Sequence, residues 1–167
     1  MAYEEASYQV VQKYENFEIR AYQERYVIQV RYNYEDGGFQ KLFNYISGKN
    51  QKSEKIEMTT PVTQYASGNQ QVMQFYLPDR FDQNNAPKPL NNSVEVASIK
   101  AGYFAVIRYS GFASDKNFFK HASILKKNLE KEKIEFDEPP IKATYNGPFT
   151  LPNLRRNEAM YLVKWNN

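Results

Sequence analysis

Sixteen consecutive residues recur, in similar form, 77 positions further along the chain. The first copy, residues 17–32, reads FEIRAYQERYVIQVRY, and the second copy, residues 94–109, reads VEVASIKAGYFAVIRY. They align without a gap, and the identical pairs are Glu18/Glu95, Tyr26/Tyr103, Arg31/Arg108 and Tyr32/Tyr109. Each copy alternates apolar and polar residues on both sides of a turn, which predicts two short strands. The repeat therefore indicates a fold that uses one structural unit twice.

An amphipathic helix is predicted after the first copy. Its apolar residues have the spacing of one helix face, and they are Phe39, Leu42, Phe43 and Ile46. Asp36 is a suitable N-cap, and Gly48 is placed to end the helix. The pattern predicts a helix of about ten residues.

A longer helix is predicted after the second copy. Either Ser114 or Asp115 can cap its N-terminus, and its apolar face consists of Phe118, Ala122, Leu125 and Leu129. The lysines between 126 and 133 are interleaved with Glu130 and Glu132, which is typical of a solvated helix face rather than a nucleic-acid surface. A helix therefore follows both copies of the repeat.

Two strands are expected after each helix. The first pair covers residues 56–65 and 71–77, and the second pair covers residues 141–145 and 158–165. Residues 78–92 are rich in Pro, Asn and Asp, which predicts a linker between a first half at about 8–77 and a second half at about 93–167 of a single domain. The expected fold is α+β, with two pseudo-symmetric strand–strand–helix–strand–strand halves forming a curved antiparallel sheet or barrel flanked by two helices.

The composition excludes several classes of function. The net charge of +3 is spread along the 167 residues, so no nucleic-acid partner is expected. The chain has no cysteine, which rules out disulfides, thiol chemistry and cysteine metal ligands. The first residues, MAYEEASYQV, lack the basic region and apolar run of a signal peptide, and no segment is long enough for a membrane span. We expect a monomeric cytoplasmic protein, unless a leader peptide has been removed.

Several segments, in order, resemble the SOUL/haem-binding-protein family. They are YENFEIRAY, FQKLFNYISGKN, KIEMTTPVT, YSGFA and YNGPFTLPNLRRNEAMYLV, and the resemblance extends from about Tyr8 to Val163. The resemblance implies a distorted antiparallel barrel of about eight strands with two helices. It also implies a protein that binds or carries haem or another tetrapyrrole and has no enzymatic activity.

A tetrapyrrole site needs an apolar surface for the macrocycle and cations for its propionates. The apolar candidates are Phe39, Phe43, Ile46, Ile56, Met58, Phe149, Leu151 and Leu154. The cationic candidates are Lys41 and Lys55, with Lys49 nearby, and Arg155 and Arg156. The helical spacing of the first group equally fits a packed core, and Met58 on an alternating strand is more typical of core than of a ligand contact. Arg155 and Arg156 have a structural alternative, which is pairing with Glu158, Glu18 or Glu57.

No clear axial ligand for haem iron is present. The one histidine, His121, falls at the edge of the apolar face of the second predicted helix. Some relatives carry a histidine directly after the Ile-Arg pair of the first strand, where this chain has Ala21. Any bound haem is therefore expected to depend on apolar and propionate contacts, with a tyrosine or water near the iron.

Two other functions are compatible with the sequence. A small-molecule hydrolase would use a cleft lined by tyrosine and glutamate, for which the candidates are Glu18, Glu57, Glu95, Tyr45 and Tyr103. A protein-interaction module would use exposed aromatic residues. One histidine and no cysteine leave no visible triad or zinc site, so we predict no catalytic residue and no metal ligand.

Overall fold

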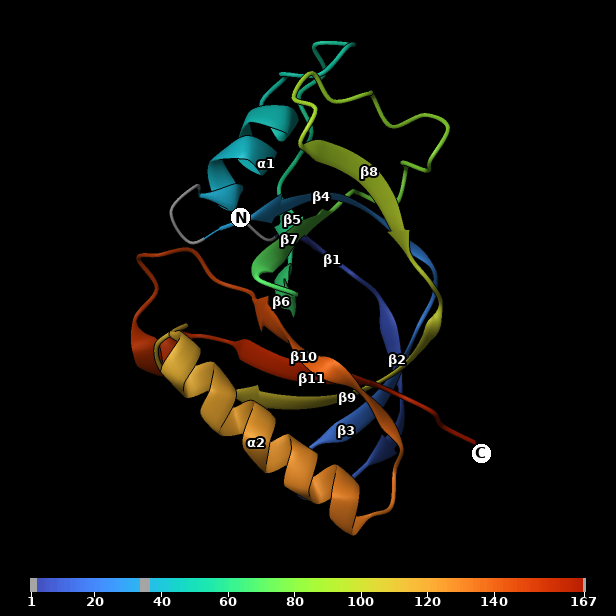
Figure 1. The fold of residues 1–167 in the computed structure, drawn as a ribbon, viewed down its shortest axis with the longest axis vertical. Helices are drawn as coiled ribbons and strands as arrows, with labels where there is room; N and C mark the ends of the chain where they lie inside the picture. Colours follow the sequence, from blue (N-terminus) through green and yellow to red (C-terminus); the bar gives the residue numbers. More distant parts are fainter. Residues whose placement is uncertain (1–2, 34–36, 167) are drawn as a thin grey trace. The chain divides into compact units, whose positions relative to one another are not determined.

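The computed structural model describes residues 3–33 and 37–166 (Figure 1). By their contacts these residues divide into two compact units. The first unit combines Met1–Ala6 with Glu24–Lys100, and the second combines Ser7–Gln23 with Ala101–Asn167. In each unit a helix packs on antiparallel strands. The predicted α+β class is therefore confirmed.

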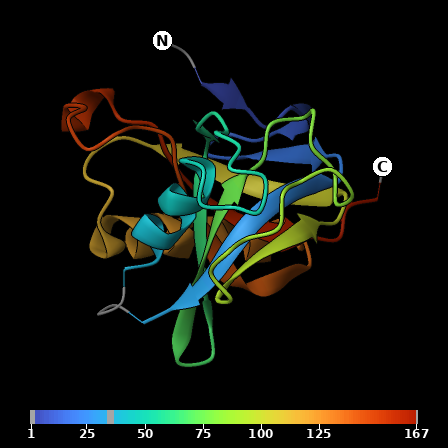
Figure 2. The same ribbon diagram turned by 90° about the horizontal axis from the view of Figure 1, so that it is seen from above.

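An antiparallel sheet and the helix α1 make up most of the first unit. Its strands are β4 (Arg25–Tyr32), β6 (Val62–Ser67), β7 (Gln70–Tyr76) and β8 (Val94–Ile99), which lie in the order β6-β7-β4-β8. A parallel pair joins β1 (Glu4–Glu5) to β5 (Thr59–Thr60). The hairpin of β6 and β7 turns at Gly68, whose φ of 61° suits a residue without a Cβ (Figure 2).

Helix α1 (Gly38–Ile46) confirms the first predicted helix. Leu42, Tyr45 and Ile46 are buried in a core that the helix shares with the sheet. Gly48 follows the last turn with a φ of 117°, as predicted for a residue that ends a helix. The N-cap position is Gly37, without a side-chain cap, and the predicted cap Asp36 lies outside the described residues.

Five antiparallel strands and the helix α2 make up the second unit. Its strands are β2 (Tyr8–Lys13), β3 (Glu18–Tyr22), β9 (Gly102–Tyr109), β10 (Phe136–Thr144) and β11 (Asn157–Val163), in the order β2-β3-β9-β11-β10. A short 3₁₀ helix, η1 (Pro152–Leu154), lies in the loop before β11. The two units thus contribute four and five described antiparallel strands, nine in all, where about eight were predicted.

Helix α2 (Asp115–Lys131) confirms the second predicted helix. Ser114 is the N-cap, and its hydroxyl accepts a hydrogen bond from the backbone N–H of Asn117 at 3.2 Å. All the residues predicted for the apolar face, Phe118, Ala122, Leu125 and Leu129, are buried in the core of the second unit.

Prolines explain where strand boundaries differ from the prediction. Of the strand expected over residues 56–65, residues 56–58 form no strand, and the remainder is divided at Pro61 into β5 and β6, because proline has no N–H for a sheet ladder. The strand expected at 141–145 begins earlier, at Phe136, and its pairing with β11 shifts register between Asp137 and Ile141, across Pro139 and Pro140. Strand β2 was not predicted at all.

Each copy of the sequence repeat contributes one strand to each unit. The first copy forms β3 and β4, and the second forms β8 and β9. Of these, β4 and β8 pair within the first unit, whereas β3 and β9 pair within the second. The linker predicted at residues 78–92 lies within the first unit, and the division of a single domain into halves stays a prediction. Across the described residues, no helix has the length and apolar composition that crossing a lipid bilayer requires.

Candidate functional site

The two flanks of α1 differ in chemistry. Successive residues of a helix are about 100° apart, so Phe39 and Phe43 lie on one side of the buried stripe and Lys41 lies on the other. The contacts agree with this placement. Phe39 packs edge-on against Phe75 of β7, with ring centroids 5.1 Å apart, whereas Lys41 lines a pocket together with Val94 of β8. The sequence-predicted residues Phe39 and Lys41 therefore do not share a surface.

Phe39 and Phe43 form an exposed aromatic pair, which we call the aromatic platform. Their ring centroids are 6.1 Å apart and their planes differ by 15°. The side chains remain 45% and 44% exposed, although both lie beside the core. Because these rings are exposed, nearly parallel and next to the core, they provide a flat apolar surface for a planar ligand.

The segment that follows α1 runs beside its C-terminal end. The backbone N–H of Ile56 donates to the carbonyl of Ile46 at 2.8 Å, and both side chains are buried in the same core. Met58 is partly buried and packs against this core, while Lys55 is exposed. The packing interpretation of Ile46 and Ile56 is thus favoured, and Lys55 is the predicted cation nearest in sequence to this contact.

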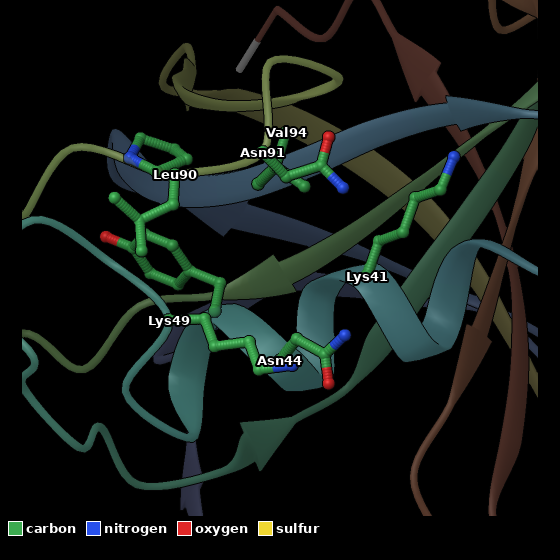
Figure 3. A pocket seen from close by; sticks show the side chains of 8 residues that line it. Lys41, Asn44, Lys49, Leu90, Asn91 and Val94 are labelled. Carbon is green, nitrogen blue, oxygen red and sulfur yellow. The ribbon is translucent and has the colours of Figure 1, made fainter.

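A pocket of about 350 Å³ opens on the other flank of α1 (Figure 3). We call it the lysine pocket. Its lining consists of Lys41, Asn44, Tyr45, Lys49, Pro89, Leu90, Asn91 and Val94. These residues come from α1, from the turn after it, from the segment that leads into β8 and from the first residue of β8. No carboxylate is among the described residues that line it.

The loop before β11 holds the other apolar candidates. Phe149 is 98% exposed, and Leu151 and Leu154 are also largely exposed. The loop is anchored at Pro152, whose carbonyl accepts a hydrogen bond from the backbone N–H of Gly111 at 2.8 Å. These side chains lie on the surface of the second unit, whereas the aromatic platform belongs to the first.

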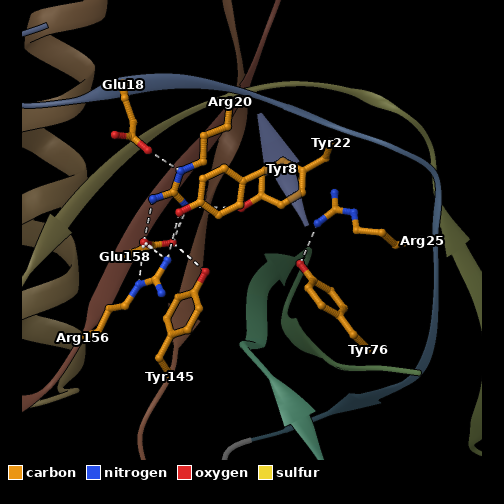
Figure 4. Close-up of polar contacts among 9 residues, drawn as sticks. All are labelled: Tyr8, Glu18, Arg20, Tyr22, Arg25, Tyr76, Tyr145, Arg156 and Glu158. Carbon is orange, nitrogen blue, oxygen red and sulfur yellow. Dashed lines mark hydrogen bonds and ion pairs between the residues drawn. The ribbon is translucent and has the colours of Figure 1, made fainter. Parts of the chain in front are cut away.

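Arg156 belongs to a buried ionic cluster with Arg20 and Glu158 (Figure 4). Arg20 donates to both carboxylate oxygens of Glu158, at 2.8 Å each, and to Glu18 at 2.7 Å. Arg156 donates to Glu158 at 3.1 Å through Nε and lies over the ring of Tyr145 at 3.8 Å. Glu158 is completely buried. The pairing of Arg156 with Glu158, one of the alternatives derived from the sequence, is therefore observed.

The cluster fixes the charge of Glu158. Burial alone would raise the pKa of this carboxyl, but the hydrogen bonds and charge of Arg20, together with the charge of Arg156, hold that pKa below its usual value. Burial and the neighbouring carboxylate raise the pKa of Tyr145, whose hydroxyl donates to Glu158 at 2.8 Å. Glu158 is therefore an ionised structural anion at neutral pH. The role of Arg20 was not predicted, because a charged residue inside a predicted strand was its only signal in the sequence.

The residues considered for catalysis or metal binding have structural partners. Glu57 pairs with Arg80 at 2.6 Å, and Glu95 accepts a hydrogen bond from Gln29 at 2.6 Å. His121 stacks on Tyr109 with ring centroids 4.0 Å apart. Within residues 3–33 and 37–166, no group of three His, Asp or Glu side chains is arranged to hold a metal ion. The carboxylates of the predicted Tyr/Glu cleft are therefore each bound to a different partner.

Comparison with known proteins identifies close relatives in sequence. The model of the SOUL heme-binding protein family matches residues 3–162. Heme-binding protein 2 of Homo sapiens is 33% identical over 137 residues, which make up 77% of this chain and 65% of that protein. The match thus spans just under two thirds of that relative's length.

Solved structures share the fold at much lower identity. An uncharacterized conserved protein from Listeria innocua aligns with a TM-score of 0.68 and 10% identity, covering 92% of this chain and 94% of that one. A hydrolase from the same organism aligns with a TM-score of 0.63 and 11% identity over the same shares of the two chains. At this identity the likeness concerns the fold alone.

Proposed function

The chain belongs to the SOUL heme-binding protein family, and from this premise we propose that it binds haem or a related tetrapyrrole at the aromatic platform without catalysing a reaction. The observation that carries the proposal is the pair of exposed, nearly parallel rings of Phe39 and Phe43. A macrocycle laid against them would bury apolar surface that the folded chain leaves in water.

We propose that the propionates are bound by exposed cations near the C-terminal end of α1. Lys55 is the first candidate, because Ile56 next to it is hydrogen-bonded to the end of α1. Phe149, Leu151, Leu154 and Arg155 stay predicted contacts of the ligand. Arg156 and Lys41 are left out, since Arg156 neutralises Glu158 and Lys41 lies on the other flank of the helix.

The available side chains favour a tetrapyrrole that is held by apolar and ionic contacts, without a histidine bound to its iron. His121 is held by Tyr109 and by the carbonyl of Asn117, which lies 2.8 Å from Nδ1, so the proposal uses no histidine as an axial ligand. The carboxylates considered for acid–base chemistry are engaged by Arg20, Arg80 and Gln29. A monomeric state and a cytoplasmic location also stay predictions.

Titration with ferric haemin, followed by its Soret band, tests the proposal. We expect saturable one-to-one binding that the change Phe39→Ala/Phe43→Ala weakens about tenfold or more, because half-exposed rings would lose their contact with the macrocycle. The same variant should weaken the binding of metal-free protoporphyrin to a similar extent, since contact with the aromatic rings rather than iron ligation holds the ligand. His121→Ala should leave the haemin spectrum unchanged.

A matched control uses another exposed aromatic residue. Phe119 on α2 is 57% exposed, so Phe119→Ala removes a comparable ring from the second unit. Equal loss of haemin affinity in this control and in the platform variant would mean nonspecific adsorption. Arg155→Ala tests the loop separately, because it decides only whether residues 149–155 add to the site.

A further inference from the structure

We propose that the lysine pocket is a second binding site, for a small organic anion that carries an apolar body. This inference goes beyond tetrapyrrole binding and does not depend on it. The pocket lies beside α1 and β8 in the first unit, on the flank opposite the aromatic platform. It is built from polar donors on one side and an apolar wall on the other.

The polar groups of the pocket are almost all hydrogen-bond donors. Oδ1 of Asn44 accepts from Gln40 at 2.8 Å, and Oδ1 of Asn91 accepts from the backbone N–H of Ser93 at 2.9 Å. The backbone N–H of Ser93 can only donate, so it fixes the orientation of the Asn91 amide, whose NH₂ group has no protein partner in the described part of the chain. Gln40 and Asn44 are both amides, and in either orientation of this pair Asn44 keeps at least one N–H without a described protein partner. Figure 3 shows the two side chains coming from opposite sides of the pocket.

Two ammonium groups add positive charge to these donors. Lys41 and Lys49 form no ion pair and no side-chain hydrogen bond within residues 3–33 and 37–166, and no described carboxylate lines the space with them. The hydroxyl of Tyr45 is already used, because it donates to the carbonyl of Pro87 at 2.6 Å. A site that offers amide N–H and ammonium groups but few acceptors matches a carboxylate or another organic anion.

The walls of the pocket are fixed before any ligand binds. Asn50 is buried and holds the turn after α1, since its amide donates to the carbonyls of Tyr45 and Glu54 at 3.0 and 2.8 Å. The segment opposite is tied to this turn by a hydrogen bond from the N–H of Gln51 to the carbonyl of Lys88 at 2.9 Å, and by a bridge between Asn50 and Pro89. A preformed pocket loses little conformational entropy on binding.

The size and the apolar wall define the rest of the ligand. Leu90 is 60% exposed, and with Pro89, Val94 and the ring of Tyr45 it provides the apolar side of the pocket. A volume of about 350 Å³ is at the lower end of small-molecule sites. The ligand class is therefore an aromatic or short aliphatic carboxylate, much smaller than a tetrapyrrole.

Calorimetric titration with 1-naphthylacetate, compared with its neutral amide, tests the inference. The two probes have nearly the same shape and differ in charge. We expect the acid to bind with one-to-one stoichiometry and the amide to bind at least about tenfold more weakly, because charge-assisted hydrogen bonds are lost. Methyl resonances of Leu90 and Val94 should shift on titration, which places the probe in the pocket.

Two variants, each with a matched control, test whether the binding of 1-naphthylacetate requires the donors and positive charges of the lysine pocket. Lys41→Met/Lys49→Met should weaken the binding of 1-naphthylacetate about tenfold or more, whereas Lys52→Met/Lys88→Met, with the same change in net charge, should not. Asn91→Asp keeps the acceptor for Ser93 but replaces the donor with a carboxylate, so it should also weaken the binding of 1-naphthylacetate about tenfold or more. Asn92→Asp, one residue further and outside the lining, is its control.

Three results would overturn the inference: equal affinity for acid and amide, an unchanged affinity in Lys41→Met/Lys49→Met, or displacement of 1-naphthylacetate by haemin. The last result would show that the pocket belongs to the tetrapyrrole site. Failure of the two proposals is distinguishable, because Phe39→Ala/Phe43→Ala should retain 1-naphthylacetate binding and Lys41→Met/Lys49→Met should retain haemin binding.

Discussion

Glu158 is the residue on which the second unit depends most for its polar contacts. It is completely buried, and Arg20 and Arg156 both donate to it. Replacing Glu158 with Gln would remove the negative charge and leave the guanidinium groups of Arg20 and Arg156 next to a neutral, buried amide. We predict that Glu158→Gln lowers the free energy of unfolding by about 3–5 kcal/mol at pH 7, measured by urea denaturation.

An exposed ion pair provides the control for this change. Glu57 pairs with Arg80 at 2.6 Å, but both side chains are largely in water. Glu57→Gln should therefore cost less than about 1 kcal/mol. If the two glutamine variants lost the same free energy, burial would not be what makes the Glu158 cluster important.

The sequence could predict the ionic cluster only as one alternative among several. Arg156 and Glu158 are two positions apart, so their pairing was a local possibility. Arg20 is 138 positions from Glu158, and no local pattern marks a contact between residues so distant in sequence. The register of β3, β9 and β11 brings them together, and that register is set by the whole sheet.

At the scale of single elements, the helices were the most predictable. Their apolar residues recur with the helical period, and this pattern depends only on nearby residues. Strand β2 was missed because most of its residues are exposed and their order carries little alternation. The prediction of the binding site on α1 was less successful. Phe39, Lys41 and Phe43 were predicted to contact one ligand, but helical geometry places Lys41 on the other flank of the helix.

The N-cap of α2 gives a test at this scale. The Ser114 hydroxyl accepts from the N–H of Asn117, one of the N–H groups that the helix itself leaves unpaired. We predict that Ser114→Ala lowers the free energy of unfolding by about 1 kcal/mol. Ser123→Ala, at an exposed position inside the same helix, should instead leave stability unchanged or raise it by a few tenths of a kcal/mol. Urea denaturation of both variants measures the difference, and a loss in Ser123→Ala as large as in Ser114→Ala would contradict the capping role.

At the scale of the whole molecule, the repeat predicted the order of elements but not which strands pair. The two strands of each copy have their partners in the other copy, since β4 pairs with β8 and β3 pairs with β9, and the division of the chain into two halves stays a prediction. Pairing between strands is decided by long-range contacts that a repeat in sequence does not specify. The family resemblance supplied the proposed class of ligand, whereas the neighbours of the two flanks of α1, Phe75 on one side and Val94 on the other, depend on long-range packing.

The response of the molecule to acid follows from the cluster. The pKa of Glu158 is lower in the folded chain than its usual value near 4.5, so unfolding at low pH takes up a proton. The stability that Glu158 contributes is therefore complete above that usual value and is lost as the pH falls through the folded pKa. We predict that the free energy of unfolding, measured by urea denaturation, falls between about pH 4.5 and pH 3, with a slope from this carboxylate of up to about 1.4 kcal/mol per pH unit. Glu158→Gln starts from a lower midpoint but should show a flatter pH dependence, because its amide takes up no proton. Parallel curves for the two proteins would mean that other carboxylates control unfolding in acid.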